Sequence, residues 1–509
     1  MDAEFEVEQL SPLEARFEQM RRGLGMALAP LVFAGIWRLP LESLSPEAHR
    51  LAAVMAAVVV LWITEAVPMP VTALLGASLC VVLRVAPVKE VFAPFADPIM
   101  FLFIGSFILA RAIFLHQLDK RLAFGVLSLR WVGAYPSRIL FAYGAVTAFM
   151  SGWISNTATT AMMFAIGMSL LGFLFEQQRN SGTAIHRRYA TGLMLMTSFA
   201  ASIGGLATPI GTPPNLIGLG FIRESLGREI PFVTFAMIGA PVVALMFVFL
   251  YAYLNFFCSA GVREIAGSHE MLERQRSRLG PWTTGQRSTL AAFLLTVSLW
   301  VVPGLIALTA GVQSDLYKAV NGSMPEAVAA LLGAALLFVL PGDQSGRAIT
   351  WHEAAKIDWG IVLLYGGGFA LGVLSNQTGL AEAIGVGLAS LLPLAESGLL
   401  LLIAATLVAT MISEATSNTA SATIVVPVAI SIARAAGADP LESALGATFG
   451  ASLGFMLPVS TPCNAIVFGS GYVPLTRMIR YGILLDIVGV GVIVTLVRLL
   501  TPMLRANLG

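Results

Sequence analysis

Long apolar stretches recur along the whole chain and constrain its fold more than any other feature. A helix that crosses a bilayer needs roughly 20 mostly apolar residues. Of the 509 residues, 57% are hydrophobic and only 12% are charged, a balance that suits an apolar solvent. The sequence therefore predicts an all-α polytopic membrane protein with eleven transmembrane helices, near residues 24–40, 51–64, 67–86, 98–118, 189–220, 231–257, 288–310, 325–341, 359–375, 441–473 and 479–501.

Two further apolar stretches, near 138–177 and 397–434, are interrupted in the middle by polar residues. Each is either two crossings or a re-entrant hairpin that enters and leaves the membrane by the same face. With two hairpins and a cytoplasmic N-terminus, 20 of the 30 Lys and Arg residues fall on the inside. This bias is the one that basic residues show in membrane proteins. We therefore expect a multi-pass protein of the cell inner or plasma membrane with its C-terminus outside.

Three landmarks in the first half of the chain recur in the same order in the second half. A helix opening (DPIMFLFIGSF, then DWGIVLLYGGGF), the tetrapeptide SNTA, and a Thr-Pro segment (GTPPN, then STPCN) return at offsets of 261, 262 and 249 residues. They begin at Asp97 and Asp358, at Ser155 and Ser417, and at Gly211 and Ser460. Five predicted crossings separate the two helix openings, so the second unit is expected to be inverted relative to the first, as in secondary transporters.

The repeat divides the chain into six expected segments. They are a cytoplasmic tail (1–23), scaffold helices (24–96), a first repeat core with one hairpin and one broken helix (97–257), a cytoplasmic linker (258–287), scaffold helices of the second repeat (288–357) and a second repeat core with the other hairpin and broken helix (358–501).

The polar residues that interrupt the apolar stretches are the candidate binding residues. Non-helical backbone at membrane depth persists only where it is buried in protein or lines a watery cavity. Ser, Asn and Thr favour helix N-termini, so Asn156 and Asn418 are expected to start the second arm of each hairpin, where free N–H groups suit a carboxylate. In TPIGTPPNLIG (208–218) and LPVSTPCNAIV (457–467), proline frees backbone carbonyls. Such oxygens suit a cation such as Na⁺.

Other polar residues in or near the spans are less informative. Glu65 is expected to be interfacial or structural, and Glu414 either tunes the second motif, couples protons or supports the hairpin. Arg111 and Asp486 are expected to snorkel or pair near helix ends. The glycines of YGGGFALG (365–372) are expected to permit close helix packing rather than bind phosphate.

At these motifs the sequence resembles the divalent anion/sodium symporter (DASS) family, the INDY-like di- and tricarboxylate carriers. The resemblance covers about residues 24–500 and includes WITEAVP, WISNTATTAMM, GTPPN, the second SNTA and LPVSTPCNAIVFGSG. It implies a homodimer in which a mobile transport domain slides past a fixed scaffold like an elevator.

The resemblance also implies two sets of site residues. Substrate contacts would come from Ser155, Asn156, Thr157, Ser417, Asn418, Thr419, Thr212, Pro213, Thr461 and Pro462. One Na⁺ site would use Ser151, Ser155, Asn156 and the backbone of Gly211, and the other would use Ser413, Thr416, Asn418 and the backbone of Ser460. Two departures between the repeats are visible, because Ser460 replaces Gly211 and Cys463 replaces Pro214.

Electrostatics agrees with cation coupling. The motifs contain no Lys or Arg, and a dianion at mid-membrane without compensating charge costs several kcal/mol. Two or more co-transported Na⁺ ions would supply the missing charge. The alternatives on the same fold are a cation-independent dicarboxylate exchanger and a carrier of sulfate or another divalent anion.

Other classes of function fit less well. An intramembrane enzyme needs a nucleophile with its base, or metal ligands, and the five histidines have no metal-binding spacing. A channel would not need inverted repeats. The net charge of +1 indicates no nucleic-acid partner.

Overall fold

A computed structural model describes residues 12–181, 186–265, 267–311, 313–343, 346–391 and 397–508. Every regular element in these ranges is a helix. Ten of the described helices are long and apolar enough to cross a membrane, and α14 (Asp315–Ser323) with α15 (Glu326–Leu337), bent by 46°, adds an eleventh candidate. The predicted all-α polytopic fold is confirmed.

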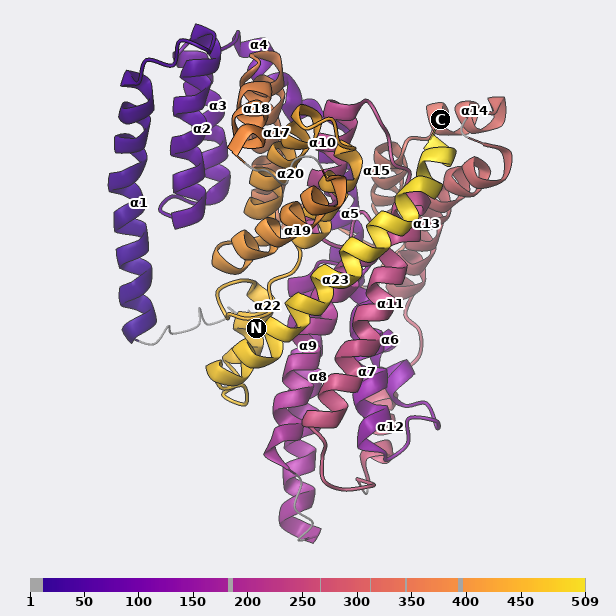
Figure 1. Ribbon diagram of the computed structural model, residues 1–509. Coiled ribbons are helices and arrows are strands. Elements are labelled where there is room, and N and C mark those ends of the chain that lie inside the picture. Colours follow the sequence, from indigo (N-terminus) through magenta and orange to yellow (C-terminus); the bar gives the residue numbers. More distant parts are fainter. Residues whose placement is uncertain are drawn as a thin grey trace.

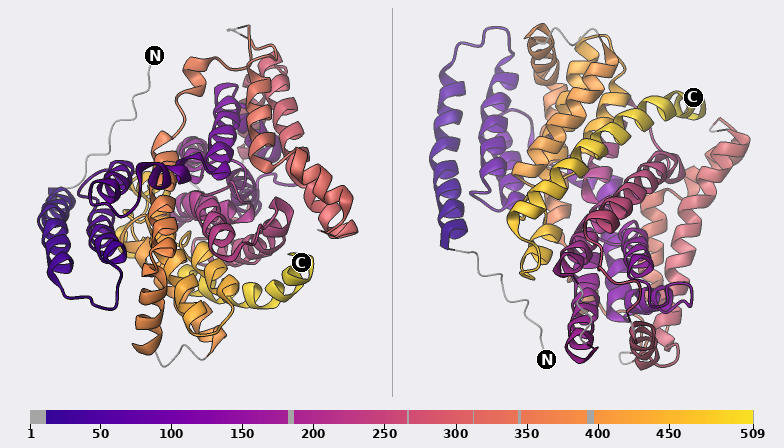
Figure 2. Two further views of the ribbon diagram at one scale, coloured as in Figure 1. Left: turned by 90° about the horizontal axis from the view of Figure 1, so that it is seen from above. Right: turned by 60° about the horizontal axis from the view of Figure 1, so that its bottom comes forward.

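The first part of the chain forms a separate layer at one edge of the molecule (Figure 1). It contains α1 (Pro12–Arg38), α2 (Pro46–Thr64), α3 (Met69–Val82), the short α4 (Val88–Phe92) and the 3₁₀ turn η1 (Ala93–Ala96). In Figure 2 this indigo layer remains at the edge in both views. It contacts the remainder mainly through α3 and η1, which pack against α17 (Trp359–Gln377).

Two units with the same order of helices follow, and the remaining helices lie between them in the sequence. The first unit comprises α5 (Pro98–Leu115), α6 (Leu118–Leu127), α7 (Pro136–Ser151), α8 (Asn156–Ser181), α9 (Arg187–Gly204), η2 (Gly205–Ala207), α10 (Pro213–Leu226) and α11 (Phe232–Phe257). The second comprises α17, α18 (Leu380–Leu391), α19 (Gly398–Ala415), α20 (Asn418–Ala435), α21 (Pro440–Gly450), α22 (Pro462–Phe468) and α23 (Leu475–Leu508). Between them lie α12 (Ser268–Arg278), α13 (Thr284–Ala310), α14, α15 and α16 (Trp351–Ala354).

Equivalent helices of the two units have equivalent neighbours. In the first unit α7 packs against α8, α9 and α11, and in the second α19 packs against α20, α21 and α23. The units also exchange contacts, because α10 packs against α20 and α21 while α22 packs against α8 and α9. The core of the molecule is therefore built around the two broken helices, and α23 crosses it diagonally (Figure 1).

The glycines in the middle of α17 allow close helix packing, as predicted. A Cβ atom at Gly367 would lie 2.6 Å from Ala73 of α3, and one at Gly366 would lie 2.5 Å from Phe95 of η1. Real Cβ contacts are not this short, so larger residues would push the N-terminal layer away.

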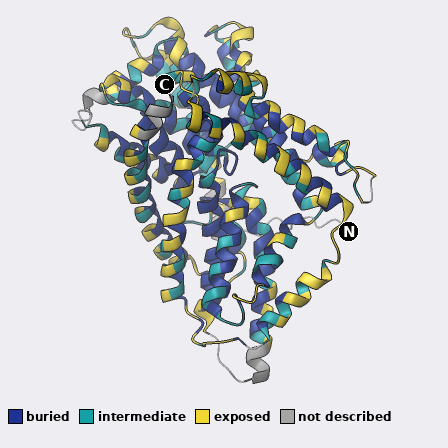
Figure 3. Cartoon of the chain, turned by 90° about the vertical axis from the view of Figure 1, so that its right-hand side faces the viewer, coloured by how far each residue is buried: buried dark blue, intermediate teal, exposed yellow. Residues whose placement is uncertain are grey.

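Large apolar side chains cover much of the outer surface. Figure 3 shows exposed residues along the outward faces of the helices and buried residues in the interior. Phe256, Met411 and Ile487 expose 76%, 69% and 63% of their surface. A water-soluble protein rarely exposes so much contiguous apolar surface, so this exterior fits lipid.

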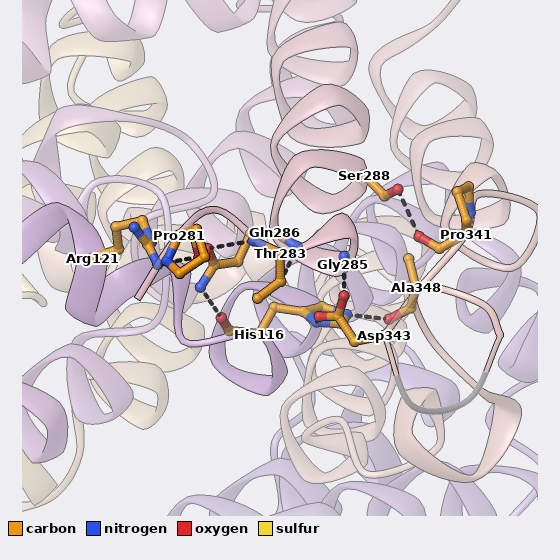
Figure 4. Close-up of polar contacts among 10 residues, drawn as sticks. All are labelled: His116, Arg121, Pro281, Thr283, Gly285, Gln286, Ser288, Pro341, Asp343 and Ala348. Atoms are coloured by element: carbon orange, nitrogen blue, oxygen red, sulfur yellow. Dashed lines mark hydrogen bonds and ion pairs between the residues drawn. The ribbon is translucent and has the colours of Figure 1, made fainter. Parts of the chain in front are cut away.

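A polar joint ties the end of α5 to the start of α13 (Figure 4). His116 Nε2 lies 2.6 Å from the Ala348 carbonyl oxygen, and Gly285 N–H donates to Asp343 Oδ1 over 3.0 Å. Hydrogen bonds from the Thr283 side chain and the Gly285 backbone hold the pKa of Asp343 below its usual value. These contacts hold α5, α13 and the loop after α15 in fixed positions relative to one another.

Candidate functional site

The first SNT motif forms the tip between two helix arms. α7 ends at Ser151 and α8 begins at Asn156. Ser155 Oγ accepts a hydrogen bond from Ala158 N–H over 3.3 Å, which caps the second arm. The prediction that Asn156 starts this arm is confirmed.

The second SNT motif forms the same kind of tip. α19 ends at Ala415 and α20 begins at Asn418, while Ser417 Oγ accepts from Ala420 N–H over 3.2 Å. The predicted start at Asn418 is likewise confirmed. Both tips present helix N-termini, whose free N–H groups and dipole favour an anion.

Four oxygen-bearing groups converge beside the first tip. One terminal atom of the Asn156 amide lies 2.7 Å from Ser151 Oγ and 3.2 Å from the carbonyl oxygens of Gly211 and Ala201. With its nitrogen in this position the amide donates to all three. With its oxygen there instead, that oxygen would lie against three other oxygens, and a hard cation bound among them would stabilise the contact. The predicted residues Ser151, Asn156 and Gly211 therefore come together.

A matching group lies beside the second tip. Ser413 Oγ is 2.7 Å from Asn418 Oδ1 and 2.9 Å from the Ala451 carbonyl oxygen. Gly454 lies at the centre of this group, because a Cβ atom there would be 3.3–3.5 Å from Ser413, Asn418 and Ser460. The Thr416 hydroxyl instead donates to the Ile412 carbonyl of its own helix, over 2.8 Å.

Two asparagines hold the broken helices in shape, and the sequence predictions missed them. Asn215 Nδ2 donates to the carbonyls of Gly205 and Thr208 over 2.9 and 2.8 Å. Asn464 Nδ2 donates to the carbonyls of Gly454 and Leu457, both over 2.9 Å. The signal was present, since each is the last residue of a repeated Thr-Pro segment at the 249-residue offset.

The Thr-Pro pairs start the helices that follow the breaks. Thr212 and Thr461 are the N-cap residues of α10 and α22, and Pro213 and Pro462 occupy the first helical position. This position suits proline because its missing N–H would have no helical partner.

Cys463 brings the second broken helix to the first hairpin. Its buried thiol faces the side chains of Thr157 and Thr160 on α8 and of Ser202 on α9. A second contact between the units runs from Ser198 Oγ to Asn464 Oδ1 over 2.6 Å. The two half-sites are therefore joined rather than independent.

Each tip borders a cavity, and the two cavities differ. A cavity of about 500 Å³ beside the second tip is lined by Ser417, Thr419, Glu65, Arg22 and Asp358, among others. A cavity of about 530 Å³ beside the first tip is mainly apolar, with Trp153, Phe232 and Val301 in its wall.

Three charged residues near the spans can now be placed. Glu65 pairs with Arg21 over 2.8 Å and Arg111 pairs with Glu353 over 2.5 Å, in agreement with their expected roles. The expectation for Asp486 was wrong, because it lies inside α23 with 5% exposure and faces Glu414. The hydropathy of the sequence does not show which neighbouring segment packs over the Asp486 side chain.

The donors at both tips are hydroxyl, amide and carbonyl oxygens. Among the described residues, no group of three or more His, Cys, Asp and Glu side chains is placed to hold a metal ion. The arrangement therefore fits a weakly bound, exchangeable monovalent cation better than a resident transition metal.

Comparison with known proteins decides the family. The sequence profile described as "Sodium:sulfate symporter transmembrane region" matches residues 22–506, almost the whole chain. The chain belongs to the divalent anion/sodium symporter family. It is accordingly a membrane transporter and not an enzyme.

Relatives within the divalent anion/sodium symporter family are similar over most of their length. The sodium-dependent dicarboxylate transporter SdcS of Staphylococcus saprophyticus is 30% identical over 487 residues, which cover 94% of this chain and 91% of that protein. SdcS of Staphylococcus aureus strain RF122 has the same identity and coverage. A solved structure of the Alcanivorax borkumensis YdaH transporter aligns over 81% of this chain and 86% of that one, with 14% identity and a TM-score of 0.49.

Proposed function

We propose that this protein is a secondary active transporter that carries a small dicarboxylate of the succinate, malate or fumarate type together with Na⁺. The observation that carries the proposal is the pair of oxygen clusters around Asn156 and Asn418, each beside a helix N-terminus. The oxygen clusters suit a cation, and the helix N-termini suit a carboxylate. The printed names of the SdcS relatives support the same substrate class.

Two Na⁺ ions would occupy the two clusters. The first would be held by Ser151, Ser155, Asn156 and the Gly211 carbonyl, and the second by Ser413, Thr416, Asn418 and the Ser460 carbonyl. Since neither motif contains Lys or Arg, the ions supply the positive charge that a dianion needs in a medium of low dielectric constant. Substrate affinity is therefore expected to depend on Na⁺.

The substrate would lie between the two tips. Its carboxylates would meet the N-terminal residues of α8 and α20 and the Thr-Pro residues that begin α10 and α22. The contacts would come from Ser155, Asn156, Thr157, Thr212, Pro213, Ser417, Asn418, Thr419, Thr461 and Pro462.

An elevator movement would expose this site alternately to the two sides. The mobile part would contain α7–α11 and α19–α23, and the remaining helices would form the scaffold of a homodimer. With the N-terminus in the cytoplasm and the repeats inverted, the cavity beside Ser417 would open to the cytoplasm. Ser417 Oγ donates to Met69 Sδ over 3.3 Å, a weak contact between this tip and the helix that would belong to the scaffold.

Uptake by proteoliposomes tests the proposal. Purified protein should accumulate labelled succinate when a Na⁺ gradient is imposed, and excess sulfate should compete weakly. Asn156→Ala and Asn418→Ala should each abolish this uptake, whereas Asn376→Ala, which loses only a contact with Ser225, should preserve it. Uptake that ignores Na⁺ and requires internal dicarboxylate would show an exchanger, and strong competition by sulfate would show a broader anion carrier.

A further inference from the structure

A groove on the outer apolar surface runs between α11 and α23. It has a volume of about 460 Å³ and is lined by Phe249, Ala252, Tyr253, Phe257, Arg480 and Leu484. The two helices are antiparallel here, because Tyr481 lies beside Cys258 while Gly489 lies beside Met246. We propose that this groove binds one anionic phospholipid, with its phosphate at Arg480 and an acyl chain between the helices.

One wall of the groove is a row of aromatic rings on α11. Phe249 stacks on Tyr253 with ring centroids 5.5 Å apart, and Tyr253 meets the edge of Phe257 at 5.2 Å. Tyr253 also packs on Tyr481 of α23 at 5.1 Å, so the rings are fixed from both helices. In a bilayer an acyl chain binds protein through van der Waals packing rather than through the hydrophobic effect. A preformed row of rings provides the shaped surface that such packing needs.

The end of the groove near the helix termini is basic. Arg480 is exposed, and no carboxylate in the described part of the chain forms an ion pair with it. Its charge acts on Tyr253, while the charges of Arg477 and of Arg188 on α9 act on the neighbouring Cys258. Basic pockets between membrane helices bind the headgroups of anionic lipids. The charge of this end therefore complements a phosphate.

The basic and apolar parts follow one another in the order found in a phospholipid. Arg480 lies in the second turn of α23 and Phe257 is the last residue of α11, so both lie near one end of a span. Phe249 lies about 12 Å further along α11, as eight residues of helix predict. Arginine and tyrosine favour the membrane–water interface. In the proposed orientation this end faces the cytoplasmic leaflet, where anionic lipids are concentrated.

The other unit gives an internal comparison. Gly239 of α11 and Gly482 of α23 are equivalent, since a Cβ atom on either would lie 2.3 Å from a carbonyl oxygen in the broken helix of the same unit. By this match the equivalent of Arg480 is Met237, an exposed but uncharged residue. A lipid phosphate therefore has an arginine partner in the second unit and a methionine at the same place in the first. The site is expected in one leaflet only.

A lipid held here would join the ends of α9, α11 and α23. Because α9 and α11 belong to the first unit and α23 to the second, the lipid would hold the two units together. We therefore expect the bound lipid to raise the melting temperature. This inference is independent of the substrate and of the coupling ion.

Lipid binding to delipidated protein in detergent tests the site. Native mass spectrometry counts bound lipids while dioleoyl phosphatidylglycerol or dioleoyl phosphatidylcholine is titrated, and the wild type should bind the first phosphatidylglycerol more tightly. Arg480→Gln should weaken its binding by about 5-fold, and should weaken phosphatidylcholine by less. Ala252→Trp, which fills the apolar part of the groove, should weaken both lipids. The control is Arg130→Gln, because Arg130 is exposed and lies outside the groove.

The results separate the proposed site from its alternatives. Losses in Arg480→Gln and Ala252→Trp but not in the control, with a smaller rise in melting temperature on adding phosphatidylglycerol, would support it. Equal losses in Arg480→Gln and Arg130→Gln would show a general attraction to anionic lipid and overturn the site. Equal binding of the two lipids by the wild type, or displacement of phosphatidylglycerol by millimolar inorganic phosphate, would overturn it as well.

The acyl-chain half of the proposal has its own decisive result. Full phosphatidylglycerol binding by Ala252→Trp would show that no chain lies in the groove. If Ala252→Trp does not give monodisperse protein, Leu484→Trp decides instead, because Leu484 lines the groove from α23 and is also exposed.

Discussion

The two hairpin tips share a backbone but have different surroundings. At the first tip Trp153 stacks on Phe232 and meets the edge of Phe293 of α13, with ring centroids 6.0 and 5.7 Å apart. At the second tip Ser417 borders a polar cavity, and Glu414 stands behind it. Aromatic rings therefore pack beside the first tip and charged and polar side chains lie beside the second, although residues of both tips remain accessible.

The oxygen clusters differ in how tightly they are packed. At the first tip a Cβ atom on Gly205 would lie 2.4 Å from Asn156 Oδ1, whereas at the equivalent Gly454 it would lie 3.4 Å from Asn418 Oδ1. A methyl group would displace the first cluster, whereas the second would accept it with a shift of a few tenths of an ångström. The two repeats therefore have the same oxygen donors but differ in how well they tolerate an added methyl group.

The largest expected effect is that of Gly205→Ala. The added methyl group displaces the Asn156 amide, and we expect the apparent affinity for Na⁺ to fall by about 100-fold, as for a disturbed metal ligand. Gly454→Ala is the matched variant and should cause a much smaller loss. The Na⁺ dependence of succinate uptake checks both, and equal losses would contradict the packing difference.

The asparagines of the broken helices should rank in order of their hydrogen bonds. Asn464→Ala removes three and Asn215→Ala removes two, at about 1 kcal/mol each. The expected losses in the free energy of unfolding are thus about 3 and about 2 kcal/mol. Thermal melting in detergent gives the ranking.

A double-mutant cycle isolates the hydrogen bond between Ser198 and Asn464. In the Asn464→Ala background, Ser198→Ala should have little further effect, because its partner is already absent. Full additivity of the two substitutions would contradict the Ser198–Asn464 contact.

A buried carboxyl in α6 should make stability depend on pH. Burial raises the pKa of Asp119 to about 6, and backbone hydrogen bonds from the start of α6 offset only part of this rise. Because the folded-state pKa lies above the unfolded value, ionisation destabilises the fold, and stability rises as pH falls from about 6 toward 4. Asp119→Asn should therefore stabilise the protein at pH 7.5 by at most about 3 kcal/mol, and this gain should largely vanish near pH 4.

The second unit has Ala381 at the position equivalent to Asp119, so it lacks the destabilisation that ionisation of Asp119 causes in the first unit. Melting temperatures between pH 4 and 8 test the difference, with the exposed Glu90→Gln as control. A gain that is the same at every pH would rule out ionisation of Asp119 as its cause.

The smallest expected effect comes from restoring a missing contact. Ala447 is equivalent to Ser198 by the 249-residue offset, and Asn215 Oδ1 has no hydrogen-bond partner in the part of the chain that the structure describes. Ala447→Ser should supply one and raise stability by at most about 1 kcal/mol. The gain in melting temperature should disappear when Asn215 is replaced by Ala.

Much of the architecture could be predicted from the sequence because the signals are local. The length of an apolar run reports a membrane helix, and polar residues inside such a run mark where a helix breaks. The starts of α8 and α20 at Asn156 and Asn418 followed from capping preferences alone. The roles of these residues in binding remain predictions, since only measurements of transport and binding test them.

The contacts between distant segments were decided by tertiary structure. Asp486 meets Glu414, 72 positions earlier, because α23 crosses the second hairpin with that face inward. Cys463 faces α8 for the same kind of reason. The sequence by itself determined the family, the helices and the places where they break, since bilayer thickness and local capping control these features. The rotation and crossing of packed helices, which depend on every surrounding side chain, decided which polar groups meet at the two tips.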